Sequence, residues 1–98
     1  MNPRPIITRT PPQLAKALGL HPSEAATIRL RSELNSKIIN VITHKKLTHA
    51  QVALLASTSR TRITAIMNRN TIDISTDLML RVLHSLGYTA TIKFHRAG

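Results

Sequence analysis

The chain has 98 residues, no cysteine, and 14 Lys and Arg residues against 4 Asp and Glu, which gives a formal net charge of +10. A chain this short forms one domain with one modest core. The absence of cysteine excludes disulfide scaffolds, cysteine-based zinc sites and thiolate catalysis. Because 42% of the residues are apolar, the chain can form a folded domain. The excess positive charge of that domain indicates a polyanionic partner. Nucleic acid is the leading candidate for that partner, and an anionic membrane surface is the second.

Membrane and secretion signals are missing from the sequence. No apolar stretch approaches the roughly 20 residues that a spanning helix needs. The first ten residues carry Arg4 and Arg9 but lack the apolar run of a signal peptide. We therefore expect a soluble cytoplasmic protein that has no membrane partner.

The first half of the chain predicts a leader followed by a long helix. Residues 1–12 hold four of the five prolines, which disfavour helix and central strand, so we expect an extended or mobile leader before a single domain over residues 13–98. A short helical turn over residues 13–18 can end at Gly19. One long helix, roughly Ser23 to His44, is predicted by apolar residues at three- and four-residue steps, namely Ile28, Leu30, Leu34, Ile38, Val41 and Ile42.

Two short helices are predicted in the middle of the chain. Thr48 is a suitable N-cap for the first of them, whose apolar face is expected to hold Val52, Leu55 and Ala56, with Ala53 against a neighbour. The polar residues 57–59 break the pattern, and Ser59 can cap a second helix whose apolar face is Ile63, Ile66 and Met67. Two short helices with a tight polar turn have the geometry of a helix-turn-helix. The opposite face of the second helix holds Thr61, Thr64, Ala65 and Asn68, with Arg60 and Arg62 on its flanks.

The last third of the chain predicts a helix and a strand. Asp73 and Ser75 or Thr76 open the helix, its apolar stripe is Leu78, Met79, Val82, Leu83 and Leu86, and Gly87 is its expected C′ residue. Alternation then predicts a strand with Tyr88, Ala90, Ile92 and Phe94 on one face. The fold class is therefore mainly α, a bundle of about five helices with a C-terminal β-strand. A lone strand needs a partner. The same strand of a second subunit would give a homodimer, and the alternative is pairing with residues 6–8 of the leader.

The run from Thr48 to Asn68, THAQVALLASTSRTRITAIMN, resembles the helix-turn-helix of the XRE (lambda repressor-like) family through Ala53, Ile63, Ile66 and Asn68. The wider frame is similar to small XRE proteins, many of them HigA-type antitoxins. The shared features are LGL at residues 18–20, the long helix, a helix close to Dhh…LhRhLxxLG at residues 73–87 and the terminal strand at residues 88–94. Ser57 is a departure, because the family commonly has glycine at that turn position.

The resemblance implies that Ser59 to Asn68 is a recognition helix. Base contacts are then expected from Arg60, Thr61, Thr64 and Ala65, and phosphate contacts from Arg62, Arg69 and Asn70. His49 can touch a phosphate at the start of the bracing helix. The complete predicted DNA-binding set is Thr48, His49, Ser59, Arg60, Thr61, Arg62, Thr64, Ala65, Asn68, Arg69 and Asn70.

The sequence thus predicts a homodimeric transcriptional regulator that binds a palindromic operator in double-stranded DNA, with half-sites roughly 34 Å apart. The resemblance implies an autorepressing antitoxin with a small RelE-like toxin as its partner. One alternative is a stand-alone or phage-type XRE repressor, and another is a basic protein that binds nucleic acid without specificity. The five histidines lack metal-ligand spacing and the carboxylates are few, so we expect no metal, cofactor, catalytic residue or enzyme activity.

Overall fold

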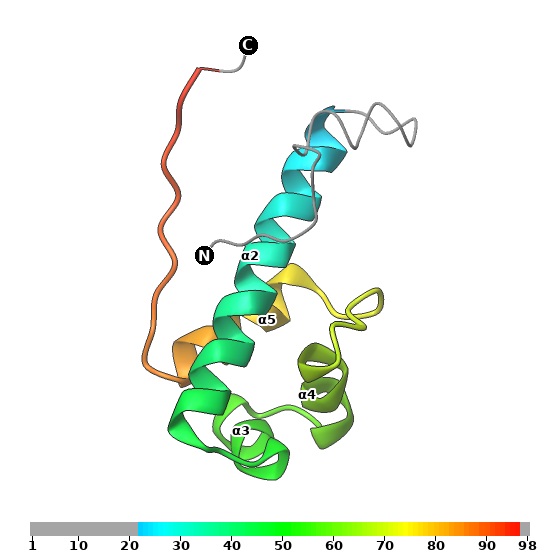
Figure 1. Cartoon of the computed structure of the whole chain (residues 1–98), viewed down its shortest axis with the longest axis vertical. Helices are drawn as coiled ribbons and strands as arrows, with labels where there is room; N and C mark the ends of the chain where they lie inside the picture. The colour runs from blue at the N-terminus through cyan, green and yellow to red at the C-terminus, as the bar shows by residue number, and fades with distance from the viewer. Residues whose placement is uncertain (1–21, 97–98) are drawn as a thin grey trace. The chain divides into compact units, whose positions relative to one another are not determined.

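A computed structural model describes residues 22–96, which contain four α-helices and no strand (Figure 1). The helices are α2 (Pro22–Lys45), α3 (His49–Ala56), α4 (Arg60–Met67) and α5 (Thr76–Ser85). The described part of the chain is therefore mainly α, as predicted, and all four helices match elements expected from the sequence. The predicted leader and the short helix over residues 13–18 lie outside the described residues. The chain divides into two compact units, residues 1–33 and residues 34–98, and the boundary between them falls within the sequence of α2.

The first unit contributes the first half of α2 to the described residues. Pro22 is its first residue and Glu24 lies in its first turn, where a proline and an acid are both favourable. An ion pair joins Arg29 Nε to Glu33 Oε2 over 3.1 Å, and both side chains are about two-thirds exposed, so it contributes little stability. Ile28 and Leu30 belong to the apolar spacing that predicted this helix, and both are exposed in the structure.

The core lies in the second unit, between α3, α4, α5 and the second half of α2. Its apolar cluster draws on all four helices, and seven of its side chains are fully enclosed. Burying a large aliphatic side chain contributes about 1.5–3 kcal/mol, so this cluster is the main source of stability of the unit. The seven enclosed side chains are Ile38, Ile42, Val52, Ile63, Ile66, Met79 and Val82.

Each helix ends with a residue in the left-handed conformation. The residue after α2 is Lys46 (φ 53°), after α3 Ser57 (φ 54°), beyond α4 Arg69 (φ 57°), and beyond α5 Gly87 (φ 93°). In every case the N–H of the left-handed residue and that of the residue after it donate to carbonyls of the last turn; after α3, for example, Thr58 N donates to Ala53 O over 2.9 Å. This is the Schellman arrangement, which prefers glycine at the left-handed position. Three of the four positions hold a side chain instead.

The helix starts are capped where the sequence predicts. Thr48 Oγ1 accepts from Gln51 N over 3.0 Å while Gln51 Oε1 accepts from Thr48 N over 2.8 Å, which forms a complete capping box at α3. Ser59 Oγ accepts from Arg62 N at α4, and Ser75 Oγ accepts from Leu78 N at α5. These caps fix where α4 begins, and so which side chains stand in its exposed first turn.

Residues 88–96 form an extended tail after α5, and their side chains are exposed. A strand was predicted here, but the described residues contain no segment that pairs with the tail, so no ladder forms. A single chain cannot satisfy an edge strand that lacks an internal neighbour. Strand formation and homodimer pairing both stay predictions.

Candidate DNA-binding surface

Helices α3 and α4 pack against each other through a three-residue turn. Val52, Ala53 and Ala56 form the buried face of α3, and Ile63 and Ile66 form that of α4. Leu55 was expected on the buried face of α3, but its side chain is 55% exposed. The buried positions of α3 are Val52, Ala53 and Ala56, and both α4 and α5 pack against this helix. Two of these three residues are alanine, whose small side chain allows neighbouring helices to approach closely.

The exposed face of α4 is polar and carries no acid. Arg60, Thr61 and Arg62 make up its first turn and all three are exposed. Thr64 and Ala65, one turn further on, are partly buried, and Ala65 packs against the core. The face therefore presents long donors at its start and small side chains in its middle, which is the shape that lets a helix approach base edges in a major groove.

A hydrogen bond ties the middle of α4 to the start of α3. His49 Nδ1 lies 2.8 Å from Thr64 Oγ1, and both side chains are partly buried. The sequence assigned these two residues to DNA contact separately, and the structure brings them together. Thr64 therefore has one of its hydrogen-bonding positions occupied before any ligand arrives, which holds its hydroxyl in one orientation.

The end of α4 is held by two neighbouring residues of α2. Asn35 Nδ2 donates to Ile66 O over 2.9 Å inside the core, and Arg69 Nη2 donates to Ser36 Oγ over 3.0 Å at the surface. Sequence reasoning missed Asn35 and Ser36 because nothing in the sequence places α2 beside the end of α4. The signal available was a polar Asn35 next to Leu34, within an apolar stripe. Arg69, predicted to meet phosphate, has one of its donors engaged within the protein.

Arg81 of α5 braces the turn between α3 and α4. Its Nε donates to Ala56 O over 3.1 Å and its Nη2 to Ser57 O over 3.5 Å, so it caps the carbonyl end of α3. A cation at this end of a helix also interacts favourably with the helix dipole. Sequence reasoning gave Arg81 no role, and the pairing depends on how α5 packs on α3.

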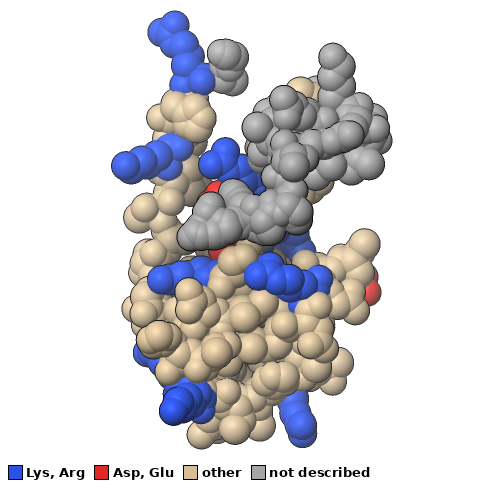
Figure 2. Space-filling model, in the orientation of Figure 1, with Lys and Arg blue, Asp and Glu red and all other residues tan. Residues whose placement is uncertain are grey.

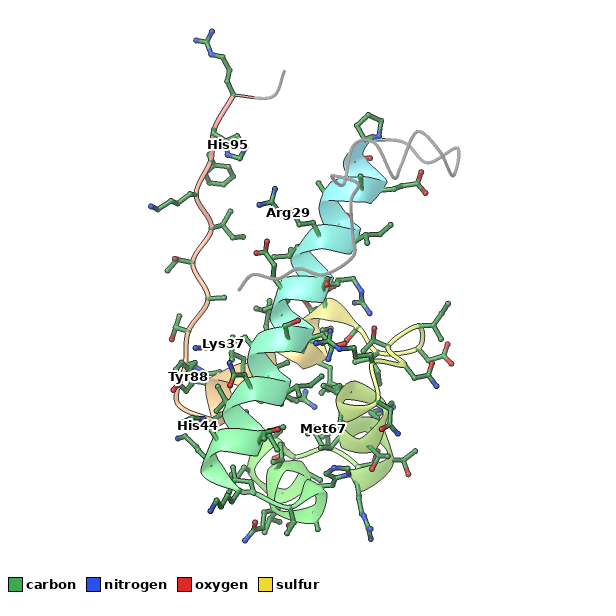
Figure 3. All side chains as sticks on the ribbon, viewed as in Figure 1. Arg29, Lys37, His44, Met67, Tyr88 and His95 are labelled. Carbon is green, nitrogen blue, oxygen red and sulfur yellow. The ribbon has the colours of Figure 1, made fainter. Side chains whose placement is uncertain are left out.

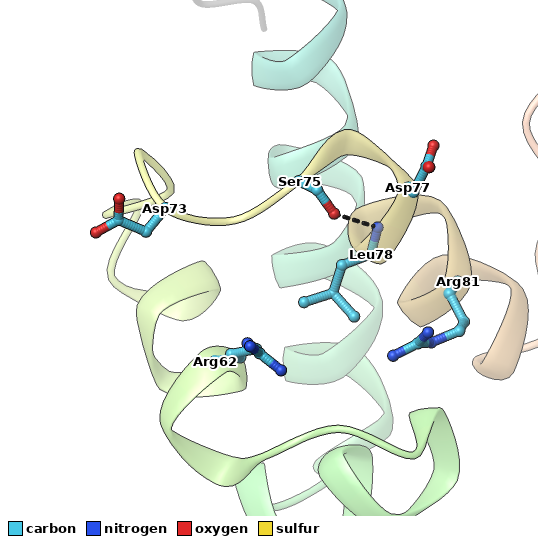
Figure 4. A pocket seen from close by; sticks show the side chains of 6 residues that line it. All are labelled: Arg62, Asp73, Ser75, Asp77, Leu78 and Arg81. Atoms are coloured by element: carbon cyan, nitrogen blue, oxygen red, sulfur yellow. Dashed lines mark hydrogen bonds between the residues drawn. The ribbon is translucent and has the colours of Figure 1, made fainter.

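A shallow hollow of about 330 Å³ lies between α4 and α5 (Figure 4). Arg62 and Arg81 line it together with Asp73 and Asp77, and Ser75 is occupied in capping Leu78 N. The two arginines and two aspartates cancel in charge, so the hollow does not select an anion. Its two aspartates place negative charge in the same hollow as Arg62.

Positive charge dominates the rest of this surface. Figure 2 shows Lys and Arg side chains spread over the visible face of the described residues, with acidic atoms in only small areas. The sequence has no acid at all between Glu33 and Asp73, whereas six Lys and Arg residues fall in that interval. They are Lys37, Lys45, Lys46, Arg60, Arg62 and Arg69.

Other kinds of site find no support within residues 22–96. No three His, Asp or Glu side chains there are grouped so that they could hold a metal ion. None of the helices in the same residues is long and apolar enough to cross a bilayer.

A short bracing helix, a tight turn and a second short helix with an exposed polar face define a helix-turn-helix protein, a class whose fold binds DNA. The family model described as a helix-turn-helix domain matches residues 19–95. The chain belongs to that family. No curated protein and no solved structure matches the chain significantly.

Proposed function

We propose that this protein is a sequence-specific transcriptional regulator that inserts α4 into the major groove of its DNA operator. The observation that carries the proposal is the exposed first turn of α4, where Arg60, Thr61 and Arg62 stand on a helix whose opposite side is locked in the core. A helix fixed in this way presents its side chains in one orientation, which sequence reading requires.

The side chains divide into two roles. Arg60 and Thr61 lie in the exposed first turn and are long or polar enough to read base edges, while Ala65 and the Thr64 methyl suit contact with a thymine methyl. Arg62, Arg69 and Asn70 are assigned to phosphates, which position the protein without reading sequence. The hydrogen bond between His49 and Thr64 supports the assignment of Thr64 to a base contact, because it holds the Thr64 side chain in one orientation. Ser59 and Asn68 are the N-cap and C-cap of α4, and Thr48 is the N-cap of α3.

A homodimer is part of the proposal. Two copies related by a two-fold axis would present two α4 helices to half-sites about 34 Å apart. The tail supports this arrangement because Ile92 and Phe94 are apolar side chains that stay exposed among the described residues 22–96. Deleting residues 88–98 and measuring the mass in solution by light scattering tests it: a monomer is expected, and a dimer that survives would place the interface elsewhere.

Selection from a pool of random DNA duplexes tests the proposal as a whole. The purified protein should enrich a palindromic motif, and Arg60→Ala should relax the base preference at one position of each half-site. A basic protein that binds nucleic acid without specificity would enrich no motif, because phosphate attraction alone does not distinguish sequences. That outcome would remove the regulator proposal.

Repression of its own operon as an antitoxin is the narrower form of the proposal. It rests on the resemblance to HigA-type proteins and requires a partner toxin. RelE-like toxins are basic, and this chain offers only Glu24, Glu33, Asp73 and Asp77 to attract one. That scarcity favours the alternative of a stand-alone or phage-type repressor. Co-purification with the product of a neighbouring small gene would support the antitoxin, and its failure would leave the stand-alone regulator.

A further inference from the structure

The tail presents an unpaired alternating pattern that begins at a fixed point. Lys37 Nζ lies 4.6 Å and Lys45 Nζ 5.9 Å from the centre of the Tyr88 ring, and Lys45 also donates to Leu86 O over 3.2 Å. Figure 3 shows Lys37 and Tyr88 together where the tail leaves α5. Beyond Tyr88 the apolar side chains become steadily more exposed, from 38% at Tyr88 to 69% at Ile92 and 93% at Phe94. The tail is thus anchored at one end and uncovered along the rest.

We propose that the tails of two copies pair as an antiparallel ribbon with Thr91 on the two-fold axis. Tyr88 then faces Phe94 of the partner subunit, and Ala90 faces Ile92 of the partner subunit. Thr89 faces Lys93 of the partner subunit on the other side of the ribbon. This register deepens the homodimer of the proposed function and rests on it.

Two-fold symmetry and the alternation of the tail together give the ribbon one apolar side. Directly opposite residues in an antiparallel pair point to the same face of the ribbon. Even-numbered positions from Tyr88 to Phe94 are apolar or aromatic, and odd-numbered positions from Thr89 to His95 are polar. A two-fold antiparallel pair sets one residue opposite its own copy on the axis, so even positions face even positions in every such register. The choice that remains is which residue lies on the axis.

The contacts at Tyr88 and the charged side chains of the tail distinguish the possible axis positions. With Ile92 on the axis, Tyr88 faces Arg96 of the partner subunit, and a third cation joins Lys37 and Lys45 at one ring. With Lys93 on the axis, Lys93 faces Lys93 of the partner subunit, and like charges directly opposite are unfavourable. With Ala90 on the axis, pairing spans only residues 88–92 and leaves Phe94 uncovered.

Thr91 on the axis avoids all three faults. It pairs residues 88–94, matches the large Ile92 with the small Ala90, and sets two aromatic residues opposite each other, which is a favourable cross-strand pair. The two Lys93 side chains are then separated along the ribbon. The pairing partner that best fits the tail is therefore the same tail of a second copy of the chain.

The absence of cysteine from the chain makes this register directly testable. Residues directly opposite across an antiparallel pair have Cα atoms about 4.5–5.5 Å apart, within disulfide range, whereas diagonal neighbours are about 7–8 Å apart. Three full-length single-cysteine variants, Ala90→Cys, Thr91→Cys and Ile92→Cys, would be oxidised with glutathione and compared on non-reducing gels. Thr43→Cys, an exposed position on α2, is the control for random collision.

Thr91→Cys is expected to form a disulfide-linked dimer at least about tenfold faster than the other three variants. A mixture of Ala90→Cys and Ile92→Cys should cross-link although neither does so alone. Faster linkage of Ala90→Cys or Ile92→Cys by itself would overturn the register in favour of another axis. Equal, slow linkage of all variants in a protein that light scattering shows to be dimeric would overturn tail pairing. Failure to enrich a DNA motif would refute the proposed function and leave the cross-linking result unaffected.

Discussion

Asn35 Nδ2 donates to the main-chain oxygen of Ile66 over 2.9 Å, and within residues 22–96 Asn35 is the buried polar side chain of an otherwise apolar core. Ile66 O also accepts from Arg69 N over 3.0 Å, so it keeps a partner if Asn35 is replaced. The hydrogen bond between Asn35 and Ile66 can form only when α2 and α4 have one particular position relative to each other. Apolar packing alone tolerates small shifts between helices, whereas a buried polar pair does not. Asn35 therefore helps to fix the position of α4, which carries the candidate DNA-binding surface, relative to the second half of α2.

Replacing Asn35 by leucine should separate stability from recognition. Asn35→Leu keeps the size of the side chain and leaves no buried donor, so we expect the free energy of unfolding to change by about 1 kcal/mol or less. We expect the affinity ratio between operator and random DNA to fall, because α4 loses its fixed position. Denaturant titration and DNA titration measure the two quantities. Met79→Ala, a core truncation on α5, is the control. It should lower the free energy of unfolding by about 2–5 kcal/mol but leave the affinity ratio between operator and random DNA unchanged under conditions where the protein is folded. Equal ratios for Asn35→Leu and the unmodified protein would refute this role.

The left-handed Ser57 offers a gain in stability. A non-glycine residue in this conformation costs about 1–2 kcal/mol, part of which glycine gives back through the greater entropy of the unfolded chain. We therefore expect Ser57→Gly to stabilise the protein by about 0.5–1 kcal/mol and to raise its melting temperature by a few degrees. Ser57→Val, whose branched side chain resists φ 54°, should lower the melting temperature. A melting temperature for Ser57→Gly at or below that of the unmodified protein would argue against strain at the turn.

Arg81 should hold the turn through its hydrogen bonds and not through its charge. Arg81→Lys keeps the charge but loses the fork that reaches Ala56 O and Ser57 O, and Arg81→Met loses both. Each variant should lose about 1 kcal/mol, since the guanidinium is partly exposed, and amide exchange at residues 57–59 should speed up. Arg62→Met, which removes the other arginine of the same hollow, is the control. Full retention of stability in Arg81→Lys would show that charge alone is sufficient.

Arg60 and Arg69 should fail differently in DNA binding. Arg60→Ala should cost about 1–3 kcal/mol against one operator position while changing affinity for random DNA little. Arg69→Gly, which suits φ 57°, should weaken all duplexes alike and reduce the slope of log affinity against log salt by about one. Ser36→Ala removes the hydrogen bond from Arg69 without removing charge, and so isolates the charge effect. Loss of only uniform affinity in both arginine variants would mean that the reading face of α4 is assigned wrongly.

The helices were predictable because their signals are local. Thr48, Ser59 and Ser75 mark three starts, and Gly87 marks one stop, all as predicted. The apolar stripe of α5 is buried throughout because that helix is strongly two-sided. Local signals were sufficient to predict the ends of a helix wherever those ends depend on capping residues next to them in the sequence.

Contacts between elements were not predictable in the same way. Leu55 is exposed on a helix that packs against both α4 and α5, and the hydrogen bonds of Asn35 and Arg81 join residues 31 and 25 positions apart. Periodicity within α3 cannot show which side its neighbours occupy. The tail has a clear alternating pattern, yet a strand needs a second strand to bond with. Sequence therefore predicted α4 and its exposed first turn but not the residues that hold the helix in place.

The ratio of operator affinity to random-DNA affinity, measured at one fixed salt concentration near the physiological value, tests the central claim most directly. If the exposed first turn of α4 reads bases, the selected palindrome should bind at least about 10³-fold more tightly than a scrambled duplex of the same length. The net charge of +10 attracts both duplexes equally and cannot create that difference. Equal affinity for the two duplexes would contradict the account and leave a basic protein that binds DNA without reading it.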